Sequence, residues 1–223
     1  ARNIDASLAW YYAPRAIAQV NVFASNISGY VKTGLNPQNT TIDLIDISNG
    51  SIKTYSINTS SQQGAKIKGV ELVFEQPIGA GFGVQSNFSR ARTKVDDGRP
   101  LVGASEYSAN VGGYFENATF SARLVYNYRG RYVASSTAPA PTANSQSNSV
   151  INGVIQPVAL FWAAPVSNVA FSVNYNITPD LRISFDATNL TNPARAQYRY
   201  SEEEQQKLDV SGRQYYLVMR YQF

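Results

Sequence analysis

The stretch "GRQYYLVMRYQF", residues 212–223, alternates between two kinds of side chain. At every second position it carries an apolar or aromatic residue, namely Tyr215, Leu217, Met219, Tyr221 and Phe223. The positions between them are largely polar and comprise Gln214, Tyr216, Val218, Arg220 and Gln222. Because successive side chains of a β-strand point to opposite faces of its sheet, this period of two predicts a strand with one apolar face.

The same alternation recurs along the chain and predicts an all-β protein. It marks nine strands, near residues 4–12, 16–24, 69–75, 82–89, 107–115, 120–128, 169–176, 181–188 and 212–223. Residues 41–57 predict a small extra hairpin with a primed turn at Asn49-Gly50. Only residues 201–208, "SEEEQQKL", have a helix-like pattern. No run of about 18 apolar residues occurs, so no transmembrane helix is predicted.

The connections between the nine strands alternate in length. Those after the first, third, fifth and seventh strands are short, and the others are long. The longest lies near residues 134–165. It contains the low-complexity run "ASSTAPAPTANSQSNS" and then "VALFWAAPV", which either folds back over the mouth of a barrel or extends the seventh strand. Short turns at one end and long loops at the other are typical of outer-membrane barrels.

This pattern favours a transmembrane, antiparallel, up-and-down β-barrel. Aromatic residues gather near strand ends, as in the girdles that lie at lipid–water boundaries. The extracellular loops are then expected near residues 32–63, 93–105, 130–166 and 191–211. The same alternation also fits a soluble sandwich, such as a secreted all-β carbohydrate-binding module whose sugar site would contain Trp162 and tyrosines.

The composition excludes several kinds of active site. The chain has no Cys and no His, which removes disulfides, thiolate or imidazole zinc sites and Ser-His-Asp triads. No nucleophile has an activating partner in the pattern, so we expect neither an enzyme nor a cofactor nor a metal site. The basic residues are scattered singly, which argues against a nucleic-acid partner.

Residues 212–223 resemble the terminal β-signal that the barrel-assembly machinery reads. The matching positions are Gly212, Tyr215, Leu217, Met219, Tyr221 and Phe223. Four further stretches resemble TonB-dependent outer-membrane transporters, and they stand in that family's order and spacing. They are "AKIKGVELVFEQPI" (65–78), "GFGVQSNFSRARTK" (81–94), "SEYSANVGGYFENATFSARLVYNYRGRY" (105–132) and "ITPDLRISFDATNLTN" (177–192).

The resemblance implies a barrel of about 22 strands with a plugged lumen. Residues 1–223 would then be the C-terminal portion of the barrel, because neither a plug nor an energy-coupling segment is recognisable in them. The implied function is active import of a scarce or large solute across a Gram-negative outer membrane. The implied partners are the remaining barrel and plug, the TonB protein, the barrel-assembly machinery, and outer-membrane lipid or lipopolysaccharide. The substrate stays open between siderophore, saccharide, cobalamin and peptide.

Two groups of residues are candidates for the function. Charged residues expected to face the lumen or plug are Glu71, Arg123, Arg182, Asp186 and Arg220; they either line a permeation path, pair with one another or bind the plug. Residues near the outer mouth that could contact a ligand are Tyr132, Phe161, Trp162, Arg195, Tyr198, Arg199 and Tyr200. Arginine can hold a carboxylate or phosphate and aromatic rings can stack on a ligand, but loop packing explains each residue equally well.

Overall fold

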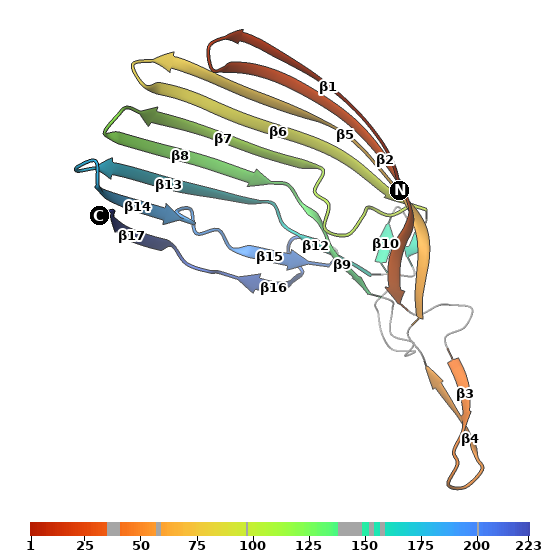
Figure 1. Cartoon of the computed structure of the whole chain (residues 1–223). Helices are drawn as coiled ribbons and strands as arrows, with labels where there is room; N and C mark the ends of the chain where they lie inside the picture. Colours follow the sequence, from red (N-terminus) through yellow and green to blue (C-terminus); the bar gives the residue numbers. More distant parts are fainter. Residues whose placement is uncertain are drawn as a thin grey trace.

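The computed structural model describes residues 1–34, 41–56, 59–96, 98–137, 149–151, 154–156, 159–199 and 201–223. Its main sheet has nine strands, each antiparallel to the next along the chain (Figure 1). In order these are β1 (Arg2–Ala13), β2 (Ala16–Gly34), β5 (Thr59–Gly79), β6 (Phe82–Val95), β7 (Tyr107–Glu116), β8 (Phe120–Arg129), β13 (Val166–Asn176), β14 (Leu181–Thr188) and β17 (Gln214–Tyr221). The nine predicted strands and their up-and-down order are confirmed.

All four short connections lie at one end of the sheet and all four long ones at the other (Figure 1). The short turn after β5 is built from Ala80 and Gly81, whose φ angles of 49° and 85° are in the left-handed region. Pro77 lies before this turn, inside β5 and opposite Gly83. In the next turn, the Asn117 side chain accepts hydrogen bonds from the backbone N–H groups of Thr119 and Phe120.

The long connections contain smaller sheets. A four-stranded sheet is formed by β9 (Tyr132–Thr137), β12 (Ala159–Ala163), β15 (Arg195–Tyr198) and β16 (Gln205–Asp209). Two hairpins are β3 (Thr41–Ile45) with β4 (Ile52–Ser56), and β10 (Ser149–Ile151) with β11 (Val154–Gln156). β12 is separated from β13 only by Ala164 and Pro165, so the described part of "VALFWAAPV" extends the seventh strand of the main sheet.

The helix-like stretch 201–208 is not helical. Glu204 donates a backbone hydrogen bond to the carbonyl of Ser201 (3.0 Å) in a turn, and the following residues form β16, paired with β15. A helix of this length is marginal in water. Pairing with β15 satisfies the backbone groups of residues 205–209 that face this strand, so strand pairing prevails over the local pattern.

The β3–β4 hairpin is present, but its predicted primed turn is wrong. Both types of primed two-residue turn require positive φ at the first central residue, here Asn49, but within residues 41–56 only Gly50 has a positive φ (70°). The connection instead spans from Asp46 to Ser51, which are joined by a backbone hydrogen bond of 2.8 Å. Hydrogen bonds from Lys53 (2.8 Å) and from the hydroxyl and backbone N–H of Ser48 lower the pKa of the partly exposed Asp46 carboxyl. The side chain of Asp46 thus stabilises the turn.

The strand register separates the main sheet into an apolar face and a polar face. Directly opposite residues share a face, and one row across the sheet runs Val84, Gly113, Leu124, Phe171, Ala187 and Tyr215. A row on the other face runs Ser7, Asn21, Glu71, Ser89, Ser108 and Arg129. Large side chains of the apolar face are exposed, as Leu8 (75%) and Leu124 (52%) show.

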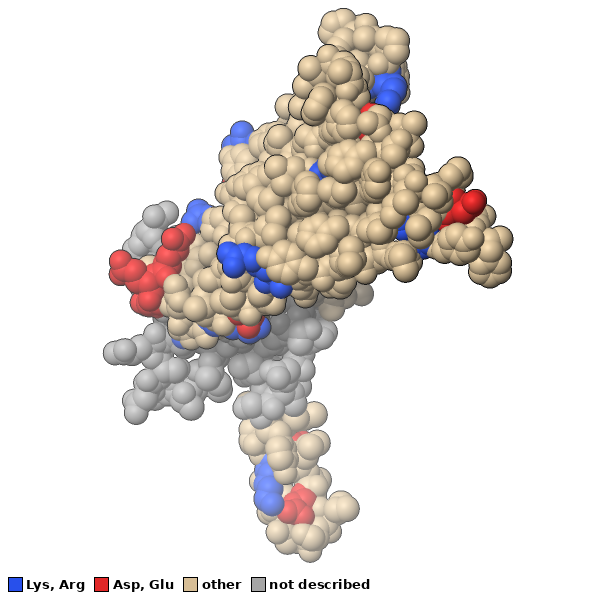
Figure 2. Space-filling model, turned by 90° about the vertical axis from the view of Figure 1, so that its left-hand side faces the viewer, with Lys and Arg blue, Asp and Glu red and all other residues tan. Residues whose placement is uncertain are grey.

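The apolar face therefore needs an apolar environment. Continuous exposed apolar surfaces on this scale mark contact with a partner or a membrane. Figure 2 views the molecule from the end with the short turns, where uncharged residues form most of the visible surface. The largest group of buried apolar residues lies in the four-stranded sheet, where Val133, Leu160, Ala163 and Tyr198 are buried.

We expect the substitution Leu124→Arg to weaken folding, because Leu124 lies near the middle of β8 on the apolar face. In lipid, an arginine there costs about 2–4 kcal/mol. The matched control is Val125→Arg on the next residue, which points to the polar face between Gly112 and Ala170. Urea titration of the full-length protein in lipid vesicles measures both changes. An equal loss for the two variants would show that the apolar face does not meet lipid.

Candidate transport surface and ligand site

The register places all five predicted lumen-facing residues on the polar face. Arg123 shares a row with Tyr114, Ser172, Asp186 and Tyr216. Its guanidinium carbon lies 6.0 Å from the Tyr114 ring centre. Glu71 lies between Asn21 and Ser89, farther toward the long connections.

Arg182 and Arg220 lie directly opposite one another on β14 and β17. Arg182 donates a hydrogen bond of 2.8 Å from Nε to the Asn176 side chain. Like charges in directly opposite positions destabilise a sheet. The two arginines border a groove of about 480 Å³, and Arg182 borders a second groove of about 430 Å³ together with Arg123. The short-turn end of the polar face thus carries three arginines, and Glu116 and Asp180 border the same two grooves.

In the described residues, none of the five charged side chains forms an ion pair with another. The geometry explains this for Arg123 and Asp186, because β13 separates their strands. Two strand spacings amount to roughly 10 Å, so the two side chains would have to lean toward each other across β13 to form a salt bridge. The charges on the polar face are therefore available to water, to a solute or to another part of the protein.

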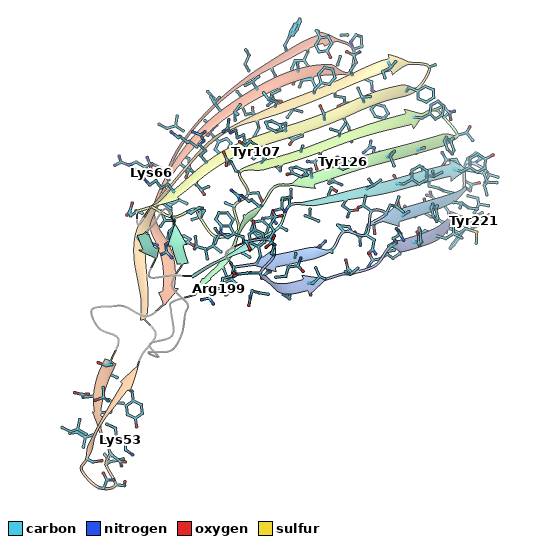
Figure 3. The ribbon with its side chains drawn as sticks, turned by 180° about the vertical axis from the view of Figure 1, so that it is seen from behind. Lys53, Lys66, Tyr107, Tyr126, Arg199 and Tyr221 are labelled. Carbon is cyan, nitrogen blue, oxygen red and sulfur yellow. The ribbon has the colours of Figure 1, made fainter. Side chains whose placement is uncertain are left out.

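The predicted ligand-contact residues come from three separate parts of the sequence, and the four-stranded sheet brings them together. Trp162 on β12 is directly opposite Tyr198 on β15, and Tyr132 on β9 is opposite Ala163 on β12. Arg199 follows β15, as Figure 3 shows. Tyr200 lies outside the described residues.

Arginines stack on three of these aromatic rings. Their guanidinium carbons lie 3.8 Å (Arg129 over Tyr132), 5.1 Å (Arg131 over Trp162) and 5.8 Å (Arg199 over Phe161) from the ring centres. Such contacts are attractive within about 6 Å. They give these aromatics a packing role, so loop packing accounts for part of the predicted site.

Sequence reasoning missed Arg129 and Arg131. Arg129 donates hydrogen bonds from Nε to the Ser105 hydroxyl (2.8 Å) and from a terminal nitrogen to the Gly103 carbonyl (2.6 Å). It thereby ties the β6–β7 connection to the end of β8. Arg195, by contrast, stands apart from the stacked aromatics, opposite Asp209, and borders a groove of about 390 Å³ with Arg129. The motif "YRGRY", which has an arginine on each side of Gly130, is the sequence signal that could have pointed to Arg129 and Arg131.

Tyr198 is the most enclosed of the predicted ligand residues that the structure describes. Only 4% of its surface is exposed, and within the described structure its buried hydroxyl has no hydrogen-bond partner. Most buried polar groups in proteins are hydrogen-bonded. This hydroxyl is therefore a free donor and acceptor with respect to the described residues.

The predicted assembly-signal residues lie on and beside β17. Tyr215, Leu217, Met219 and Tyr221 point to the apolar face, opposite Ala187, Phe185, Ile183 and Leu181. Gly212 adopts a φ of 78°, and its carbonyl accepts a hydrogen bond of 2.5 Å from the buried Asn189 side chain. Phe223 follows β17 and is exposed. The role of these residues in assembly stays a prediction.

Comparison with known proteins decides the family. A family model described as "TonB dependent receptor-like, beta-barrel" matches residues 1–190. The chain belongs to the TonB-dependent receptor β-barrel family. This membership places it in the outer membrane of a Gram-negative bacterium, and it confirms both the resemblance found in the sequence and the predicted fold class.

Solved structures of similar fold agree with this family. A variant of the ferric enterobactin receptor PfeA from Pseudomonas aeruginosa has a TM-score of 0.65 at 13% identity, covering 98% of this chain and 30% of its own. The copper transporter OprC has a TM-score of 0.63 at 14% identity, with 99% and 31% covered. The ferric yersiniabactin uptake receptor FyuA from Yersinia pestis has a TM-score of 0.61 at 16% identity, with 99% and 30% covered. The chain thus spans 30–31% of the length of these three structures.

Several other kinds of match or site were not found. No curated protein matches the chain in sequence. Nothing found favours a secreted carbohydrate-binding module. None of the described segments is a helix long and apolar enough to cross a bilayer. Nor do the described residues contain a group of three or more acidic side chains that could hold a metal ion.

We expect the substitution Tyr198→Phe to leave the stability of the receptor unchanged or to raise it. A buried hydroxyl without a partner costs about 1–3 kcal/mol, so its removal loses no favourable bond. Tyr198→Ala, the control, removes the ring as well and should destabilise by about 3–5 kcal/mol. Thermal unfolding of the full-length protein in detergent measures both. A clear destabilisation by Tyr198→Phe would mean that the hydroxyl is bonded within the protein and not available to a ligand.

Proposed function

We propose that the chain forms part of the wall of a TonB-dependent active transporter that imports a scarce metal, free or chelated, across the outer membrane. The observation that carries the proposal is the match to the receptor barrel family over residues 1–190. The two-faced sheet supports it, because an apolar outer face and a polar inner face are what a membrane channel wall requires. Such a protein is a transporter and not an enzyme.

The polar face would line the lumen. Its positive charges at Arg123, Arg182 and Arg220 would attract a plug that carries carboxylates, since buried or half-buried cations favour paired anions. The plug and the strands that pair with the free edges of β1 and β17 would come from the rest of the receptor, because this chain covers only 30–31% of the similar structures. Energy would arrive from the TonB protein through the plug.

The metal class of the substrate is supported by the solved structures of similar fold. Their titles name a copper transporter, a ferric enterobactin receptor and a ferric yersiniabactin receptor. In this chain, the contribution to substrate recognition would come from the long-connection end, where Tyr198 and the stacked aromatics lie.

The transport proposal is tested with the full-length receptor restored to a deletion strain grown without iron. The cells receive radioactive iron bound to catecholate, hydroxamate or phenolate chelators, radioactive copper, labelled cobalamin and a labelled oligosaccharide. We expect one of the metal probes to accumulate, and a protonophore to abolish the accumulation. Accumulation of cobalamin or the oligosaccharide alone would overturn the metal class but keep the transporter. No energy-dependent accumulation of any probe would contradict the function.

Cysteine labelling tests the topology, in which the long connections are extracellular. The chain has no native cysteine, so Ile47→Cys in the fully exposed tip of the β3–β4 hairpin and Ala118→Cys in the β7–β8 turn introduce single reporters. A membrane-impermeant maleimide should label the first variant on intact cells. The second should react only after the outer membrane is permeabilised, and the reverse pattern would invert the topology. The unsubstituted receptor controls for cysteines outside this chain.

A further inference from the structure

A group of basic residues lies on the apolar face, at the end of the sheet with the long connections. The outer basic cluster consists of Lys66 and Lys68 on β5 and Arg90, Arg92 and Lys94 on β6. The register is continuous here: Leu72 pairs with Phe88, Val70 with Arg90, Lys68 with Arg92 and Lys66 with Lys94. All of these residues point to the same face. That face changes from apolar to cationic within two positions.

The cluster contains more positive charge than its surroundings balance. Glu106 lies 3.3 Å from Arg90 and 3.8 Å from Arg92. Among the described residues, Lys66, Lys68 and Lys94 have no acidic partner. Five cations and one carboxylate leave an excess of four positive charges. Two directly opposite pairs, Lys66 with Lys94 and Lys68 with Arg92, consist of like charges, which destabilises a sheet unless an anion lies between or above them.

A groove of about 940 Å³ runs beside the cluster. Its walls include Lys66, Lys68, Arg92, Lys94, Arg131 and Trp162. Tyr107 and Tyr128, on the same face as the cluster, also border it. Figure 3 shows Lys66 pointing away from the sheet at the end that carries the β3–β4 hairpin, and Tyr107, on β7, nearer the middle of the sheet. Amphipathic rings beside basic groups are typical of a lipid–water boundary.

We propose that the outer basic cluster and its groove bind the phosphate groups of an outer-leaflet lipid, lipopolysaccharide, whose acyl chains lie along Leu72 and Phe88. The chemistry is charge-assisted hydrogen bonding from ammonium and guanidinium groups to phosphate oxygens. The continuity with the apolar face selects a lipid over a soluble anion, because only a lipid has acyl chains to cover Leu72 and Phe88. The proposal rests on the topology proposed above, with the long connections in the outer leaflet.

The cluster also differs from the positive charge on the polar face. Arg123, Arg182 and Arg220 lie on the opposite side of the sheet, near the short turns. A solute or plug in the lumen therefore cannot neutralise Lys66, Lys68 and Lys94. Anionic groups of the bilayer surface are the nearest available counter-charge, and basic side chains close to such a surface are attracted to it.

The test uses the full-length receptor purified in mild detergent and incubated with lipopolysaccharide. Bound lipid is counted by native mass spectrometry and by assay of its hydroxylated fatty acids. The triple variant Lys66→Gln, Lys68→Gln, Lys94→Gln should weaken binding by roughly a hundredfold, as expected for the loss of three positive charges at an anionic lipid surface. The control Arg15→Gln, Lys53→Gln, Lys207→Gln removes the same charge elsewhere and should bind as the unsubstituted receptor does.

Two further arms decide the source of the phosphate and do not depend on how the variant folds. Lipopolysaccharide stripped of phosphate should bind the unsubstituted receptor less tightly, whereas millimolar inorganic phosphate should not displace the intact lipid. Equal binding of the triple variant, equal binding of the stripped lipid, or displacement by inorganic phosphate would each overturn the proposal. Because binding is measured in detergent without transport, a negative result here leaves the uptake experiment to judge the proposed function separately.

Discussion

Pairing of backbone N–H and C=O groups between neighbouring strands is the interaction on which the rest of this structure depends. In the hydrocarbon of a bilayer no water is available, so each unpaired backbone group costs several kcal/mol. The main sheet meets this demand by joining each strand to its neighbour in an uninterrupted antiparallel series from β1 to β17. Local preferences are secondary to it, as residues 205–209 show by forming β16 in place of the helix that their pattern suggests.

The same pairing fixes which side chains share a face, because a strand has a period of two residues. One shift of register would exchange the lipid-facing leucines for the arginines and serines of the polar face. The two proposed roles follow from this: we propose that the apolar face contacts lipid and that the polar face lines the lumen. The outer basic cluster belongs to the lipid-facing side for the same reason, since Lys66 and Lys68 continue the alternation of Val70 and Leu72.

Prediction from the sequence succeeded where the alternation is long and regular. All nine main strands, the alternation of short and long connections, and the shared face of Arg182 and Arg220 could be predicted in this way. It failed at short or irregular segments. The turn after Asp46 depends on the side chain of Asp46 and the bond from Lys53, and the strands β9, β12, β15 and β16 are too short for periodicity to mark them.

The sequence by itself determined the class of the fold, the family and the polarity of each strand face. Strand periodicity is visible within a short stretch, and the family motifs follow one another in a fixed order along the chain. Only the tertiary structure decided which distant residues meet. It placed Trp162 opposite Tyr198, stacked Arg131 on Trp162, enclosed the Tyr198 hydroxyl, and set Lys66 and Lys68 against Lys94 and Arg92. These contacts join segments from different connections and strands, and their register depends on backbone pairing across the sheet, which no single stretch of sequence contains.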